Sequence, residues 1–299
     1  MSDPLKTWFE AALEARLEIP AAAWRGRVAE EISSGVTDAR FAALLSMANR
    51  HARRRSAGLT AGELTAASAL VDGWCPERWS TLDLLRVSLV LERRDLEAPE
   101  GPAALLGALR QADLGELVAL YRSFSLVPRP DDYVWQAGEG CRSNMNEVFE
   151  AVACDNPYPA LHFDDVAWRA LAIKALFIGA PLWRVHGLDG RISPELAHVA
   201  LDLCEERRSA GRPIPPELWA CLGAQGGERG LRALELELEQ GPPEGRRGAA
   251  LGLARAGALE SLRSWRERER DPAVCETMDL ALGGRHTQYE YAPLQPFQK

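Results

Sequence analysis

The chain has 299 residues, enough for one large helical domain or two smaller ones with a substantial core. Hydrophobic residues make up 46% and charged residues 26%, which is typical of a globular protein, and the net charge of -8 disfavours a general nucleic-acid binder. No stretch approaches the length and apolarity of a membrane span, and the N-terminus lacks the continuous apolar run of a signal peptide. We therefore expect a protein that neither crosses a membrane nor binds nucleic acid.

The cysteines do not follow the spacing of a disulfide framework or a zinc site. No two of them form a C-x-x-C pair, and each lies in or beside an apolar helical pattern. We interpret them as reduced thiols of a cytoplasmic protein. They are Cys75, Cys141, Cys154, Cys204, Cys221 and Cys275.

Helical periodicity runs through almost the whole chain. Leu5, Phe9, Leu13 and Leu17 lie at four-residue steps and predict a first short helix that Pro20 ends. The pattern predicts further helices over residues 21–32, 38–54, 99–110, 113–124 and 133–154 and, after residue 219, over 228–240, 246–256, 259–270 and 273–282.

Two helix starts carry recognisable caps. Thr60 and Glu63 have the spacing of a capping box, and Asp113 with Glu116 repeats the pattern. Ser80 precedes a further helix with a wide apolar face, and the long helix predicted over residues 133–154 has to tolerate two glycines.

The fold class that these patterns predict is all-α, because β-branched residues are sparse and do not alternate with polar ones. Many short helices in successive pairs of about forty residues favour an irregular HEAT-like solenoid of antiparallel helix pairs over a four-helix bundle. We expect a single domain over residues 1–282 with its most informative region at 139–219. The irregular tail over residues 283–299 is either an extended strap packed on the body or a mobile segment.

Motifs of several large enzyme classes are missing. The sequence contains no glycine-rich phosphate loop, no G-x-S-x-G nucleophile elbow and no H-E-x-x-H zinc motif. Polar side chains that core packing does not require gather instead between residues 155 and 219. Loops between well-patterned helices often hold functional residues, so this stretch is our candidate for a site.

The segment Asn156-Pro-Tyr-Pro159 is a rigid turn in which the asparagine is suited to an Asx-turn. It either redirects the chain between two helices or places Asn156, Tyr158 and His162 along a pocket. His162 alternatively caps the helix that starts near Asp164. Phe177 and three tryptophans (168, 183 and 219) are either core residues or aromatic walls of that pocket.

Lys174 interrupts an apolar run and either extends to the surface or lies half-buried beside an acid such as Asp189. Asp189 alternatively caps a helix or pairs with Arg191. His162, His186 and the nearby aspartates could hold a divalent ion if their loops meet, but the spacing matches no specific metal site, and we favour structural hydrogen bonds. No cofactor is identified.

Three segments carry a resemblance to a known family. EGCRSNMNEVFEAVACDNPYPALHF (139–163), KALFIGAPLWRVHGLD (174–189) and ERRSAGRPIPPELW (206–219) together resemble the EboA-domain family, in order and in spacing. The resemblance implies an all-α protein from a gene cluster for a secondary metabolite. It implies as partners a small aromatic or prenylated metabolite and a UbiA-type prenyltransferase or other products of that cluster.

The characteristic polar positions that the resemblance implies are our candidate ligand-binding residues, without an assigned role. They are Arg142, Asn144, Asn156, His162, Lys174, Asp189 and Arg191. One departure stands at Trp168-Arg169-Ala170, where we expect Trp-Asn-Gln in the family. If that Asn-Gln pair contacts a ligand in relatives, this chain has lost or altered the contact.

The function that we favour is a non-catalytic helical binding or scaffold protein in the biosynthesis or trafficking of a secondary metabolite. The alternative is an enzyme that modifies the metabolite by acid–base or metal-assisted chemistry at His162, Lys174 and Asp189. We expect the protein in the cytoplasm, with peripheral attachment to the inner membrane through the N-terminal helix as a further hypothesis. Glu10 and Glu14 on that helix suit an anionic bilayer poorly.

Overall fold

The computed structural model describes residues 3–294, and this part of the chain is all-helical, without a β-strand. The predicted fold class is thus confirmed at the level of all-α. By its internal contacts the chain divides into two compact units, Met1–Phe163 and Asp164–Lys299, called here unit 1 and unit 2. Each unit is described by itself.

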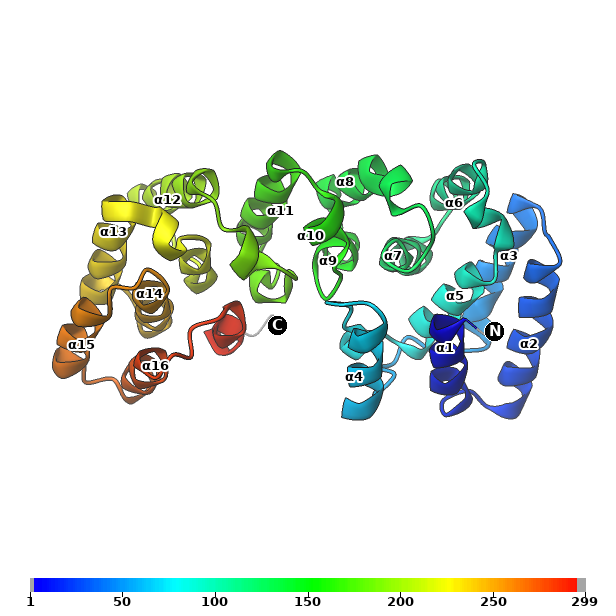
Figure 1. Ribbon diagram of the computed structural model, residues 1–299, viewed down its shortest axis with the longest axis horizontal. Helices are drawn as coiled ribbons and strands as arrows, with labels where there is room; N and C mark the ends of the chain where they lie inside the picture. Colours follow the sequence, from blue (N-terminus) through cyan, green and yellow to red (C-terminus); the bar gives the residue numbers. More distant parts are fainter. Residues whose placement is uncertain (1–2, 295–299) are drawn as a thin grey trace. The chain divides into compact units, whose positions relative to one another are not determined.

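Unit 1 is built around one buried helix (Figure 1). The α5 helix packs against α1, α2 and α7, and α7 packs in turn against α9. Every residue of α5 except Asp83 is buried. The helices of unit 1 are α1 (Pro4–Glu14), α2 (Ile19–Ser33), α3 (Asp38–Met47), α4 (Ala61–Leu70), α5 (Thr81–Leu91), α6 (Gly101–Leu109), α7 (Leu114–Ser123), α8 (Val134–Arg142), α9 (Asn146–Ala153) and α10 (Tyr158–His162).

Helix starts in unit 1 follow local sequence closely. Thr60 with Glu63 and Asp113 with Glu116 form the predicted capping boxes, in which each side chain accepts from the other residue's backbone N–H. A third capping box, formed by Ser80 and Asp83, starts α5. Pro20 does not end the first helix, because α1 ends at Glu14 and Pro20 lies in the first turn of α2, where its missing N–H costs nothing.

The apolar face of α1 belongs to the core of unit 1. Trp8 and Phe9 are buried, and their ring centroids lie 4.9 Å and 5.6 Å from that of Trp74. Aromatic pairs at such distances stabilise a core beyond the area that they bury. Because these side chains are covered, the face of α1 that the membrane hypothesis requires is not available to a bilayer.

The long helix predicted over residues 133–154 is wrong. The chain forms two helices, α8 and α9, with a break at 143–145 where Ser143 is extended and its Oγ accepts from the Met145 N–H at 3.1 Å. A Cβ on Gly140 would lie 2.8 Å from both Tyr121 and Val152. The glycine is therefore needed where α8 meets its neighbours, and is not a tolerated defect within one helix.

Unit 2 is organised around α14, which packs against α13, α15, α16 and the 3-10 helix Pro216–Cys221 (Figure 1). A Cβ on Gly248 would lie 2.5 Å from the Pro216 carbonyl oxygen, so that the backbones approach closely here. The helices of unit 2 are α11 (Asp165–Ile178), α12 (Pro194–Ser209), α13 (Gly227–Gln240), α14 (Pro243–Arg255), α15 (Leu259–Arg268) and α16 (Pro272–Leu282).

The described part of the C-terminal tail packs on unit 2. Residues 288–294 form a 3-10 helix that contacts α14 and the 3-10 helices Leu182–Arg184 and Pro216–Cys221. Gln288, Tyr291 and Leu294 are buried there. The rest of the predicted tail, residues 295–299, lies outside the described residues.

Candidate functional site

Asn156 forms the predicted Asx-turn. Its Oδ1 accepts from the Tyr158 N–H at 3.0 Å, and its Nδ2 donates to the Ala151 carbonyl oxygen at 3.0 Å. The side chain is buried, so these two bonds satisfy its amide within the protein. They hold the turn between α9 and α10.

His162 lies at the end of α10 and pairs with Asp131, with Nδ1 2.9 Å from the carboxylate Oδ1. Its ring also lies 4.7 Å from the Tyr158 ring, centroid to centroid. The alternative that His162 caps α11 is wrong, because the cap is Asp164, whose side chain accepts from the Ala167 N–H at 2.7 Å. The structure thus brings Asn156 and His162 together around Tyr158, in a hydrogen-bonded corner of unit 1.

Arg142 and Asn144 do not join that corner through any contact of the described residues. Both are exposed, and Arg142 forms an ion pair with Glu139 one turn earlier on α8. Asn144 lies in the break between α8 and α9. Exposed ion pairs of this kind contribute little to stability.

In unit 2, Asp189 anchors the C-terminal 3-10 helix. Its carboxylate lies 2.7 Å from Arg255 Nη2 and accepts from the Gln288 N–H at 3.0 Å, while its own N–H donates to Gln288 Oε1 at 3.2 Å. Asp189 therefore forms its ion pair with Arg255. The predicted alternative, a pair with Arg191, is wrong. Gln288 and Arg255 lie 66 or more positions further along the chain, and no local pattern pointed to them.

Arg191 and Lys174 also lie in unit 2. The Arg191 guanidinium lies 4.6 Å above the Trp168 ring and pairs with Asp165 at 3.0 Å. Trp168 is a buried core residue, as is Trp219. Lys174 is half-buried on α11.

Two of the segments that resemble EboA line one apolar groove in unit 2. It has a volume of about 480 Å³ and is lined by the end of α11 and the two residues after it (175–180), by Arg207, by residues 213–217 and by Leu294. Phe177 lines it and is 68% exposed, which is unusual for a phenylalanine. We call this feature the apolar groove.

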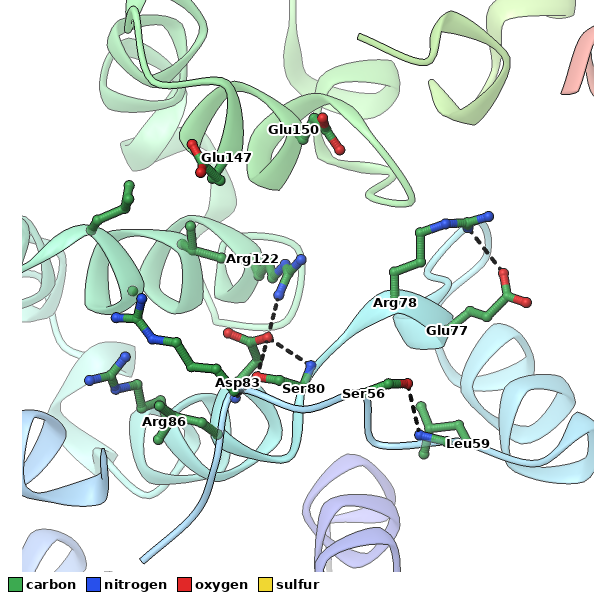
Figure 2. Close-up of a pocket in the computed structure, with 16 residues that line it drawn as sticks. Ser56, Leu59, Glu77, Arg78, Ser80, Asp83, Arg86, Arg122, Glu147 and Glu150 are labelled. Carbon is green, nitrogen blue, oxygen red and sulfur yellow. Dashed lines mark hydrogen bonds and ion pairs between the residues drawn. The ribbon is translucent and has the colours of Figure 1, made fainter. Parts of the chain in front are cut away.

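A second cavity, larger than the apolar groove, is in unit 1 and lies among α5, α7, α9 and the loops before α4 and α5 (Figure 2). Its volume is about 790 Å³, within the range of small-molecule sites. Its lining includes four arginines, and we call it the arginine pocket. The lining residues are Arg54, Ser56, Gly58, Leu59, Glu77, Arg78, Ser80, Leu82, Asp83, Arg86, Leu114, Gly115, Val118, Arg122, Glu147 and Glu150.

Some charges of the arginine pocket are neutralised locally. Asp83 lies 2.7 Å from Arg122 and closes the capping box of Ser80, as the dashed lines of Figure 2 show. Glu147 and Glu150 project from α9 on the opposite wall in the same view. The charges of Asp83 and Arg122 are thus neutralised by their own ion pair.

Arg86 differs from these residues. Its side chain is 1% exposed, and within the described part of the chain its one hydrogen bond is from Nε to the Leu45 carbonyl oxygen at 3.1 Å. Nη1 and Nη2 have no hydrogen-bond partner, although Nη2 lies 3.5 Å from Glu116 Oε1. Burial lowers the pKa of the Arg86 guanidinium, because the charged form has lost its water.

Sequence reasoning missed this pocket, although one signal was present. Arg86 interrupts the apolar run of residues 81–91 as Lys174 interrupts its own, and a charge within a core helix is expensive unless it is paired or used. The other lining residues come from loops and helices up to 96 positions apart (54–150), which no pattern in the sequence connects.

Among residues 3–294 no cluster of three His, Cys, Asp or Glu side chains is arranged to hold a metal ion. Over the same residues, none of the helices has the length and apolarity needed to cross a bilayer.

Residues 3–294 thus form an all-helical structure that contains these two cavities. A family model described as metabolite traffic protein EboA matches residues 2–223, about three quarters of the chain, and the chain belongs to this family. The match runs through both units and includes the whole lining of the arginine pocket and all of the apolar groove except Leu294. No curated protein and no solved structure matches the chain.

Proposed function

We propose that this EboA-family chain is a non-catalytic helical protein that binds a small aromatic or prenylated metabolite and passes it to partner proteins during its biosynthesis or trafficking. The observation that carries the proposal is the apolar groove. Two of the three segments that resemble EboA, 174–189 and 206–219, supply almost all of its lining.

The groove has the chemistry of an apolar binding site. The exposed Phe177 and the prolines of residues 213–216 offer rigid apolar surface. Covering this surface with a ligand favours binding by about 25 cal/mol per Å² buried. Arg207 and Glu217 supply polar atoms at the edge of the lining. Such a mixture favours a largely apolar ligand with few polar groups.

We further propose that residues 1–282 act as one EboA-like domain with a HEAT-like stacking of short helix pairs. The family match supports a single domain because it crosses the border between unit 1 and unit 2. The packing of α5 against α7, α7 against α9 and α14 against α13, α15 and α16 supports stacking within each unit.

An enzyme using His162, Lys174 and Asp189 gains no support from the observed contacts. His162 is engaged by Asp131, and Asp189 by Arg255 and Gln288. We propose the cytoplasm as the place of action, where the six cysteine thiols would stay reduced. Contact with a UbiA-type prenyltransferase or other cluster products, or with the inner membrane, would use a surface other than the buried face of α1.

The test is the affinity for farnesol and 4-phenylphenol, measured by equilibrium dialysis of the full chain. We expect Phe177→Ser to weaken binding at least fivefold, because it removes exposed aromatic surface from the groove. Val166→Ser is the matched control, since Val166 lies on the same helix, is 64% exposed and does not line the groove. Equal affinities of the two variants, or no saturable binding by the wild type, would contradict the proposal.

A further inference from the structure

The arginine pocket contains a buried guanidinium that the protein itself does not satisfy. Arg86 has lost its water and gained a single hydrogen bond, so that the donors on Nη1 and Nη2 remain available. Glu116 lies 3.5 Å from Nη2 and offsets part of the buried charge, but two donor nitrogens without a hydrogen bond still cost stability. A ligand that accepts from these donors would remove that cost.

A second guanidinium meets the first above a glycine. A Cβ on Gly115 would lie 2.3 Å from Arg54 Nη2 and 2.9 Å from Arg86 Nη1, so both groups lie against the bare Cα of this residue. The Arg54 side chain is 61% exposed, and its nearest carboxylate oxygen, on Asp113, is 3.9 Å away. Two cations thus share one place on the wall of the pocket.

The same place is the start of a helix. Gly115 is the second residue of α7, whose capping box uses the N–H groups of Asp113 and Glu116. The N–H groups of Leu114 and Gly115 have no acceptor inside the helix, and the helix dipole favours an anion at this end. The neighbouring acids accept from other donors of the capping box, because Asp113 accepts from the Glu116 N–H and Glu116 from the Asp113 N–H.

We propose that the arginine pocket binds a phosphate ester or diphosphate, with its oxygens on Arg86 and Arg54 above Gly115. A carboxylate has two oxygens, and one guanidinium can contact both of them in a bidentate pair. Two guanidiniums and a helix start offer more donors than that, and a tetrahedral phosphate supplies the additional acceptor oxygens. The volume of about 790 Å³ leaves room for the organic group that carries the phosphate.

This site goes beyond the proposed binding of an apolar metabolite and does not depend on it. The apolar groove lies in unit 2, the arginine pocket in unit 1, and the two tests use different probes and different variants. Failure of one leaves the other standing.

The experiment measures inorganic phosphate, diphosphate and malonate binding by calorimetry at constant ionic strength. In Gly115→Ala the new methyl group takes the place of the guanidinium ends, and we expect the affinity for diphosphate to fall at least tenfold. Gly107→Ala in α6 is the matched control, because a Cβ there meets nothing within 4 Å. Arg54→Gln, a substitution at an exposed side chain, should weaken diphosphate binding by a smaller factor.

Wild-type binding of diphosphate that survives Gly107→Ala and is lost in Gly115→Ala would support the site. The absence of saturable binding of either phosphate probe, or an affinity that Gly115→Ala leaves unchanged, would overturn it. Tighter binding of malonate than of diphosphate would show that the pocket selects carboxylates, and would overturn the assignment to phosphates.

Discussion

Two helical glycines, Gly115 in the arginine pocket and Gly248 in the core of unit 2, show how differently the same residue is used. At both, a Cβ would overlap a neighbour at 2.5 Å or less. At Gly248 the neighbour is the Pro216 backbone carbonyl oxygen, which α14 and the 3-10 helix hold in place. At Gly115 the closest neighbour is the end of the exposed Arg54 side chain, which can turn away.

Gly248 is thus required for packing, whereas Gly115 is required for the proposed binding site. A fixed backbone cannot move from a new methyl group, so the substitution is opposed by the fold itself. At Gly115 the exposed Arg54 end can turn away and the buried Arg86 Nη1, at 2.9 Å, is also a side-chain end, so the methyl group meets no fixed backbone while the arrangement of donors is lost. The comparison therefore identifies Gly115 as a residue whose change should affect a ligand more than stability.

The largest expected effect on stability is at Gly248, the glycine in the core of unit 2. We expect Gly248→Ala to lower the free energy of unfolding by about 1–3 kcal/mol, the usual range for overpacking. Urea unfolding of the full chain measures it. The control is Gly230→Ala in α13, where a Cβ would meet only Leu222 at 3.7 Å. That variant should be as stable as the wild type or gain from better helix propensity; equal losses in both would break the comparison.

A second prediction extends the comparison to the family segments. Asn156→Ala should lower the free energy of unfolding by about 1–3 kcal/mol, because it leaves the Ala151 carbonyl oxygen and the Tyr158 N–H without their partner. Asn144→Ala, at an exposed position of the same segment, should stay within about 0.5 kcal/mol of the wild type. If Asn156→Ala leaves thermal unfolding unchanged but weakens farnesol binding, Asn156 serves a ligand and our structural interpretation is wrong.

The smallest expected effect concerns Arg16, whose hydrogen-bond donors find acceptors within the protein, in contrast to those of Arg86. Arg16 donates to both carboxylate oxygens of Glu63 and to the carbonyl oxygens of Ala12, Ala57 and Gly58. Its hydrogen bonds lower the pKa of Glu63 to about 2. Since the folded pKa lies below that of the unfolded chain, the pair stabilises the fold above about pH 4.5, and this contribution is lost as the pH falls toward 2.

Glu63→Gln removes the charge while a glutamine can still serve in the capping box. We expect it to be less stable than the wild type at pH 7 by less than about 1 kcal/mol, the range for partly exposed ion pairs. Urea unfolding at a series of pH values should show the difference in free energy of unfolding between the wild type and Glu63→Gln falling to zero between pH 4.5 and 2. A difference that stays constant over this interval would contradict the assignment.

Local signals in the sequence predicted much of the fold. Capping boxes at Thr60 and Asp113 depend on residues three positions apart, and both formed as predicted. The break at 143–145 was missed although its turn is local, with the Met145 N–H donating to Ser143 Oγ. The role of Asp189 was missed because its partner Gln288 comes 99 residues later.

The candidate site was predicted less completely. The Asx-turn of Asn156 is a property of its own segment and was foreseen, whereas the arginine pocket joins residues from Arg54 to Glu150. Arg86 could have been noticed as a charge within an apolar run, as Lys174 was. Its unpaired donors and its approach to Gly115 exist only once α5 and α7 are packed together.

The most direct measurement determines, side by side, the dissociation constant for diphosphate and the free energy of unfolding of the wild type and of Gly115→Ala. We predict a dissociation constant at least tenfold higher in the variant and a free energy of unfolding that is unchanged or higher, by up to about 1 kcal/mol from helix propensity. An unchanged dissociation constant, or a loss of stability as large as that of Gly248→Ala, would contradict the account.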